Sequence, residues 1–207
     1  MESQFIVNIY ESRWWRGCGL FKWFAGLTLD EEMALIRRIA NPGDDDVILD
    51  LACVTGIYTR AFALGGAHRT VFGLDISWPM LKYATRKARE MGVKNAMFFH
   101  GDAHILPFAD GSLDVANCCG ALHLFADVRQ VLRELHRALR PGGRLSAAAA
   151  WKAGSGLSRL KAYLDGRLWN IHYFSKEELV SLLEEEGFDP AVYHAYGLWI
   201  AIGGVRR

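Results

Sequence analysis

Several features that would assign this 207-residue chain to a specialised class of protein are missing from its sequence. Lys and Arg number 24 against 23 Asp and Glu, so the formal charge is only +1 and lacks the basic surplus of nucleic-acid-binding proteins. The longer apolar runs, such as 147–151 and 198–202, are far shorter than the roughly 20 residues of a membrane-spanning helix. Residues 1–4 lack the basic start of a secretory signal. We therefore expect a cytoplasmic protein with no nucleic-acid partner and no stable membrane insertion.

Cysteine is scarce and its spacing is uninformative. Cys18, Cys53, Cys118 and Cys119 match no CxxC or zinc-binding pattern, so we expect reduced thiols and no metal site. The vicinal pair Cys118–Cys119 is interpreted as two small apolar residues at a strand end, with a redox role as the alternative. Apolar residues make up 51% of the chain, which excludes disorder, and at this length one hydrophobic core can carry the fold.

Short apolar runs alternate with helical patterns from residue 47 onward. Buried parallel strands are predicted at 47–51, 70–74, 96–100, 113–118 and 144–150, and two final strands at 191–196 and 198–205. Helices are predicted after Thr28, Ser77, Asp127 and Ser175, with capping boxes at 28–31 and 127–130. This alternation predicts an α/β fold, a Rossmann-like doubly wound sheet with helices on both faces.

Residues 1–40 precede this pattern and are rich in aromatic side chains, so we divide the chain into 1–40 and 41–207. The segment reads as helical, and three roles are open to it: a packed lid, the lining of an apolar pocket, or transient contact with a membrane surface. The residues concerned are Tyr10, Arg13, Trp14, Trp15, Arg16, Phe21, Lys22, Trp23 and Phe24.

Carboxylates follow three of the first four predicted strands, at the point where each strand ends. In an open α/β sheet this edge forms the ligand crevice. The turn at 50–56 keeps only Gly56 of the G-x-G-x-x-G pattern, and its acidic residue would repel phosphates, so a dinucleotide is disfavoured. Asp50 instead suits a cationic ligand, Asp75 is placed to accept both hydroxyls of a ribose, and Asp102 to accept from an adenine amine. The alternatives are that Asp50 and Asp75 cap helices and that Asp102 is a turn residue.

Five segments, at 47–56, 71–77, 100–108, 113–123 and 139–143, stand in an order and spacing that resembles a known family. That family is the class I S-adenosylmethionine-dependent methyltransferases, and the small-molecule branch with the quinone-biosynthesis methyltransferases is the most similar. The resemblance covers about residues 40–150. It implies a seven-stranded sheet with an antiparallel last strand, an N-terminal helical lid, and S-adenosyl-L-methionine as the cofactor.

The resemblance also implies which residues bind the cofactor. Asp50 and the turn after it would hold the methionine part and Asp75 the ribose, while the adenine would lie among residues after the second and third strands. Cys118 would contribute its backbone carbonyl and Tyr10 would belong to the lid. The residues assigned in this way are Tyr10, Asp50, Ala52, Cys53, Val54, Thr55, Gly56, Asp75, Ile76, Met80, Gly101, Asp102, Ala103 and Cys118.

Val54 departs from the family pattern, which has glycine at this position. A β-branched residue here would crowd the ligand or adopt a positive φ that it disfavours. A non-catalytic protein that keeps the fold, with or without cofactor binding, is therefore the alternative function.

The expected reaction is in-line transfer of the sulfonium methyl to an oxygen, nitrogen or carbon of a small, apolar acceptor, by a monomer or homodimer. Positioning should supply most of the catalysis. His123, after the fourth strand, is the candidate base, with a packed or surface histidine as the alternative. The acceptor pocket would come from residues 1–30 and 152–174. Cys119-Gly120-Ala121 replaces the Pro-Pro-aromatic signature of enzymes that methylate a flipped base, so a nucleic-acid substrate is disfavoured.

Overall fold

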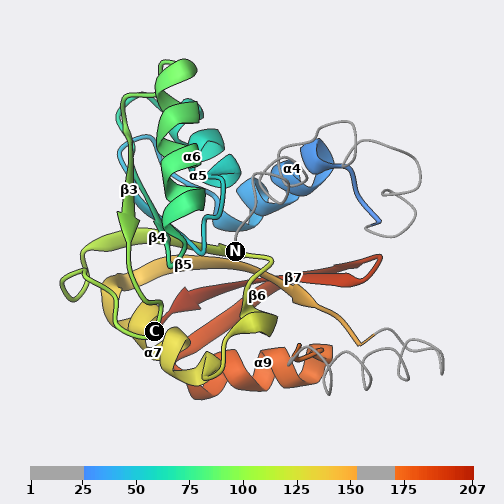
Figure 1. Ribbon diagram of the computed structural model, residues 1–207. Helices are drawn as coiled ribbons and strands as arrows, with labels where there is room; N and C mark the ends of the chain where they lie inside the picture. Colours follow the sequence, from blue (N-terminus) through green and yellow to red (C-terminus); the bar gives the residue numbers. More distant parts are fainter. Residues whose placement is uncertain (1–25, 153–170) are drawn as a thin grey trace.

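The computed structural model describes residues 26–152 and 171–207 (Figure 1). Tyr10, the other aromatic residues before residue 25, and most of the expected acceptor-side insert therefore lie outside the described residues. The division of the chain at residue 40 stays a prediction.

One mixed sheet organises the described chain, with the strand order β3-β2-β1-β4-β5-β7-β6. The strands are β1 (Val47–Leu51), β2 (Thr70–Asp75), β3 (Ala96–His100), β4 (Leu113–Cys119), β5 (Leu139–Ala150), β6 (Phe188–Tyr196) and β7 (Trp199–Arg206). Strands β1 to β5 run parallel, whereas β7 is antiparallel to both of its neighbours. The predicted doubly wound, seven-stranded sheet with an antiparallel last strand is confirmed.

Helices cover both faces of this sheet (Figure 1). Helices α4 (Leu29–Ala40), α5 (Ile57–Leu64) and α6 (Trp78–Glu90) lie on one side, and α7 (Val128–Ala138) and α9 (Lys176–Glu185) on the other. Each face has its own apolar cluster: Ile36 and Phe62 are buried on the first side, and Leu135 and Leu183 on the second. These two clusters hold the helices against the sheet and fix the edge where the strands end.

The predicted helix starts are correct, with one exception in detail. Thr28 and Ser175 form complete capping boxes, in which the side chain of the cap and that of the third helical residue each satisfy a free backbone amide. Asp127 accepts from the backbone of Gln130, but the Gln130 side chain donates to the carbonyl of His104 instead of completing the box. The capping box predicted at 127–130 is therefore wrong in its second half, because a tertiary partner competes for the glutamine.

Two connections differ from, or add to, the sequence prediction. Strand β5 begins at Leu139, earlier than predicted, because Leu139 already pairs with Leu113 before an irregularity shifts the register. The hairpin between β6 and β7 turns at Gly197, as predicted, with a φ of 53°. Gly26 packs so closely on this turn that a Cβ there would collide with the backbone of Gly197.

No helix in the described ranges is long and apolar enough to cross a lipid bilayer.

Candidate active site at the carboxyl ends of the strands

The predicted crevice lies where β1, β2 and β4 end side by side. Asp50 is the fourth residue of β1 and pairs in register with Gly73 of β2 and Asn117 of β4. Asp75 ends β2. Parallel pairing thus gathers residues that are far apart in the sequence at one edge of the sheet, as expected for an open α/β fold.

Asp50 is buried within a chain of polar side chains. One carboxylate oxygen accepts from Thr59 Oγ1 at 2.5 Å and the other from Asn117 Nδ2 at 2.8 Å, while Ser146 Oγ donates to Asn117 Oδ1 at 2.9 Å. Burial raises the pKa of Asp50 from 3.8 to about 6, and the hydrogen bonds from Thr59 and Asn117 oppose that effect. The carboxylate is therefore charged at neutral pH but turned towards protein donors, and direct contact with a ligand stays a prediction.

Asp75 holds the turn after β1. Its Oδ2 accepts from the backbone N–H of Val54 at 2.8 Å and its Oδ1 from the N–H of Ser77 at 2.8 Å. The side chain is only 7% exposed. An ionised carboxylate offers about four lone-pair sites, so each oxygen of Asp75 can accept one further hydrogen bond. This donor and acceptor balance fits a ribose, whose two hydroxyls both donate.

Every second residue of the turn has a positive φ: Ala52 at 55°, Val54 at 49° and Gly56 at 73°. The positive φ expected for Val54 is found, whereas that of Ala52 was not predicted. Cys53 N donates to Leu74 O and Gly56 N donates to Cys53 O, which tie the turn to β2 and to itself. Gly56 has a second reason to lack a side chain, because a Cβ would lie 2.7 Å from the Phe98 ring.

The residues expected at the adenine are not all gathered in one place. Ile76 is exposed at the end of β2, while Met80 and Ala103 are buried. Asp102 is exposed and accepts from the backbone N–H and the ring Nδ1 of His104, and these hydrogen bonds lower the pKa of its carboxyl. The structure therefore joins Asp50 and Asp75 around one turn, and it leaves Asp102 paired with its own loop.

Cys53 and Cys118 are buried, and their thiols are held protonated. Burial raises the pKa of both thiols, with a further contribution from the charge of Asp50. Burial also raises the pKa of Cys119, the second thiol of the vicinal pair. Because the thiolate is the reactive form, this environment argues against a redox role of Cys118 and Cys119. The contact expected between the Cys118 backbone carbonyl and the cofactor stays a prediction.

His123 lies in a short 3-10 helix, η1 (Leu122–Leu124), directly after β4. The ring is 7% exposed, its Nδ1 has no hydrogen-bond partner among the described residues, and it meets the Trp199 ring edge-on at 5.3 Å. Burial lowers the pKa of His123 to about 4, so the imidazole is neutral at pH 7. The ring can accept a proton there, but only as a weak base.

A cluster that the sequence did not indicate lies at the same edge of the sheet. Glu32 of α4 accepts from the Tyr196 hydroxyl at 2.9 Å and lies 3.9 Å from Cys119 Sγ. Tyr196 pairs with Trp199, which in turn pairs with Ala150 at the end of β5. No local pattern could reveal this cluster, because the partners come from the start, middle and end of the chain.

Comparison with known proteins agrees with this geometry. Residues 49–147 match the sequence model of a family described as a methyltransferase domain. The demethylmenaquinone methyltransferase of Geobacillus stearothermophilus is 40% identical over 109 residues, which are 52% of this chain and 47% of that protein. The chain thus spans less than half the length of this curated relative.

Two solved structures share the fold at low sequence identity. The [4+2]-cyclase SpnF superposes with a TM-score of 0.76 and 18% identity, over 86% of this chain and 81% of the other. The geranyl diphosphate C-methyltransferase of Streptomyces coelicolor, solved with S-adenosyl-L-homocysteine, gives 0.75 and 15%, over 87% and 77%. These matches show the fold alone. The family match and the curated relative confirm the resemblance that the five motifs carry: residues 49–147 resemble the class I S-adenosylmethionine-dependent methyltransferases, and the quinone-biosynthesis enzymes among them.

Proposed function

We propose that this protein transfers the methyl group of S-adenosyl-L-methionine to a small, apolar acceptor. The observation that carries the proposal is the position of Asp75, a nearly buried carboxylate that ends β2 and accepts a hydrogen bond from the backbone of the turn after β1. In a methyltransferase domain of this family, that turn and that carboxylate are expected to frame the nucleoside. When bound, the cofactor supplies an electrophilic methyl group on a sulfonium, and the protein supplies position and charge.

The ribose is assigned to Asp75, because its two remaining acceptor sites match two adjacent hydroxyl donors. The turn from Ala52 to Gly56 would lie against the methionine part. Ile76 and Ala103 would pack against the adenine, with Met80 behind them and Gly101 leaving room at the edge. Asp102 would accept from the exocyclic amine, and the Cys118 carbonyl would lie nearby. Tyr10 keeps its proposed place in the lid.

Asp50 is assigned a supporting role. Its oxygens are occupied by Thr59 and Asn117, so we propose that it fixes the turn and contributes negative charge near the sulfonium and ammonium groups instead of binding them directly. A buried charge acts over several ångströms because the surrounding protein screens it less than water does. This role still needs the carboxylate in its ionised form.

The acceptor is proposed to be apolar because large apolar side chains are exposed around the crevice. Ile76, Ile105 and Leu124 are 71%, 77% and 56% exposed, and they follow β2, β3 and β4, respectively. Exposed apolar groups that gather at one edge are typical of a binding surface. Three cysteines of the described chain, Cys53, Cys118 and Cys119, are unpaired, which suits a reaction in the cytoplasm.

His123 is the proposed base for acceptors that lose a proton before or during transfer. A neutral imidazole with a depressed pKa is effective only if the acceptor is itself acidic, such as an activated phenol. We therefore expect His123→Gln to lower kcat for acidic phenols that are still protonated at the assay pH, and to lower it less for phenols of higher pKa, with little change in cofactor affinity. An equal loss for all acceptors and for cofactor binding would instead indicate a packing role.

The proposal is tested by isothermal titration calorimetry with S-adenosyl-L-methionine and S-adenosyl-L-homocysteine. Asp75→Asn should weaken binding about 10- to 100-fold, because hydrogen bonds to a charged group contribute about 1.5–3 kcal/mol. Asp45→Asn, at an exposed aspartate away from the crevice, is the matched control and should bind like the wild type. Thermal unfolding of each variant checks that the turn stays folded.

Turnover is then measured as transfer of a labelled methyl group to a panel of phenols and hydroquinones. Transfer to at least one of them supports the enzymatic proposal. Binding of both ligands without transfer to any member of the panel would favour the non-catalytic alternative. Absence of binding in both the wild type and Val54→Gly would overturn the proposal altogether.

A further inference from the structure

Strand β3 forms an edge of the sheet, and the outer side of its backbone is unpaired. Val71 N donates to Asn95 O, and Gly101 N donates to Asp75 O. These two hydrogen bonds show which alternate residues of β3 bond to β2. Because alternate residues of a parallel strand bond to the same neighbour, the peptide groups of Ala96, Phe98 and His100 face outward. No strand of the described chain pairs with this side.

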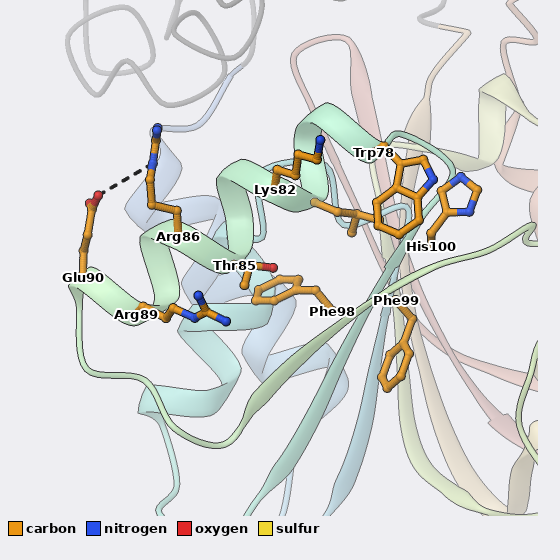
Figure 2. Close-up of a pocket in the computed structure, with 10 residues that line it drawn as sticks. Trp78, Lys82, Thr85, Arg86, Arg89, Glu90, Phe98, Phe99 and His100 are labelled. Atoms are coloured by element: carbon orange, nitrogen blue, oxygen red, sulfur yellow. Dashed lines mark ion pairs between the residues drawn. The ribbon is translucent and has the colours of Figure 1, made fainter.

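A groove of about 650 Å³ runs between this edge and helix α6 (Figure 2). Lys82, Arg86 and Arg89 follow one another at helical spacing along its α6 wall. The acidic residue of the lining, Glu90, lies 3.7 Å from Arg86 and also pairs with Lys87. Among the described residues, neither Lys82 nor Arg89 has an ion-pair partner. The groove therefore presents a surplus of positive charge alongside unpaired backbone groups.

The opposite face of β3 is apolar. Phe98 points towards α6, whereas Phe99 points away from it (Figure 2). Met97 and Phe99 share this second face, each is 42% exposed, and the Phe99 ring lies 5.6 Å from Phe72. Edge strands are usually protected by charged side chains or proline, because an apolar edge invites pairing with another chain. The sequence of β3 has neither protection on this face.

We propose that this edge binds an extended segment of a partner protein as an added strand, with acidic residues alternating with apolar ones. Side chains of a strand alternate between its two faces. Acidic side chains of the added strand would therefore meet Lys82 and Arg89, and the intervening apolar ones would cover Met97 and Phe99. Its backbone would pair with Ala96, Phe98 and His100. This interaction surface is separate from the proposed methyl transfer.

A second copy of this chain fits the surface poorly. A β3 to β3 contact would bring the sequence Ala-Met-Phe-Phe-His against itself and would place the two rows of cations near each other without an acidic partner. A single-stranded nucleic acid would satisfy the cations and could stack on the aromatic rings. It would, however, leave the outward amide and carbonyl groups of β3 without the paired ladder that a peptide strand provides.

One end of the groove is closed by the rings of Trp78 and His100, which stack at 4.7 Å with 5° between their planes. His100 Nε2 lies 2.9 Å from the carbonyl of Ile76, so this wall is tied to the end of β2. The docked strand is thereby limited to about the length of β3, five residues. Binding should depend on a short segment.

The experiment measures fluorescence anisotropy of a labelled peptide of seven alternating Glu and Val residues, added to the full chain. We expect saturable binding, at least tenfold weaker binding of the matching Lys and Val peptide, and about a tenfold loss for Lys82→Glu/Arg89→Glu. Arg38→Glu, an exposed arginine on α4, is the matched control and should bind like the wild type. Cofactor titration of the double variant should be unchanged, which separates this test from that of the proposed function.

Strand pairing is tested with two N-methylated peptides, one methylated at its odd-numbered residues and the other at its even-numbered residues; these are the two phases of methylation. Methyl groups block one edge of a strand, so one phase should bind and the other should not. Equal binding of the two phases, or no saturable binding of the unmodified peptide, would overturn the proposal. Tighter binding of a ten-residue oligothymidylate than of the peptide, lost in the double variant, would also overturn it and assign the groove to nucleic acid.

Discussion

Replacing Val54 by glycine should stabilise this protein, although glycine usually has the opposite effect. Val54 has a φ of 49°, in the left-handed region that β-branched residues disfavour. Its backbone N–H donates to Asp75 Oδ2, and that bond does not depend on the side chain. The substitution therefore removes strain without removing the contact that holds the turn.

The magnitude follows from two opposing effects. The left-handed conformation costs an L-residue about 1–2 kcal/mol, and this cost disappears in the variant. Glycine loses about 0.5–1 kcal/mol more conformational entropy on folding. The expected net gain is about 0.5–1 kcal/mol, which for a chain of this size corresponds to a rise in Tm of about 1–4 °C. Calorimetry at pH 7 with several scan rates measures it.

Two controls separate strain from packing. Val54→Ala keeps the positive φ and removes the branch, so it should change Tm less than Val54→Gly. Ala52→Gly releases the smaller strain of an unbranched residue at a φ of 55° and should give a gain no larger than that of Val54→Gly. A fall in Tm of 2 °C or more for Val54→Gly would refute the reasoning, because it would show that the native turn does not disfavour valine.

Three further outcomes are expected. Burial raises the pKa of Asp50 from 3.8 to about 6, so the folded chain holds this proton more tightly than the unfolded one. Its contribution to stability should be full below about pH 4 and fall by roughly 3 kcal/mol as the pH rises through 6. Urea midpoints from pH 4 to 7.5 should show that slope in the wild type and a flatter profile in Asp50→Asn; identical slopes would contradict this assignment. Tyr196→Phe should cost about 1–3 kcal/mol by losing its hydrogen bond to Glu32, whereas Tyr193→Phe, at an exposed ring, should stay within about 0.5 kcal/mol in the same urea assay. Leu135→Ala, on the buried face of α7, should cost about 2–5 kcal/mol by the same measurement, and a smaller cost would mean that the site collapses around the lost side chain.

The fold could be predicted because it depends on patterns that are local in the sequence. Strands buried on both faces give continuous apolar runs, and β1 and β3 have the predicted bounds. Caps such as Thr28 act within three residues, so they too are visible in the sequence. The start of β5 was missed because Leu139 pairs with Leu113, a contact that depends on the assembled sheet.

The candidate site could be predicted only in part. The positions of Asp50 and Asp75 follow from strand ends, but their partners do not. Thr59 and Asn117 engage Asp50 from α5 and β4, and nothing in the sequence distinguishes them from other polar residues nearby. The positive φ of Ala52 could not be predicted because alanine is common in ordinary helices and strands. Local chemistry thus locates the crevice, and tertiary contacts decide which atoms are free in it.

Asp75 shows why the turn and the proposed cofactor site cannot be considered separately. Its Oδ2 accepts from Val54 N, and the remaining lone pairs are those assigned to the ribose. A ligand that draws the carboxylate outward would lengthen the hydrogen bond that keeps Val54 in its strained conformation. A ligand that leaves the carboxylate in place gains a preorganised acceptor at no further cost. The low exposure of Asp75, and its second hydrogen bond to Ser77 N, favour the latter, because two backbone donors fix the carboxylate from both sides. The strain at Val54 is therefore a cost of folding and not of binding, so relieving it should raise stability more than it raises cofactor affinity.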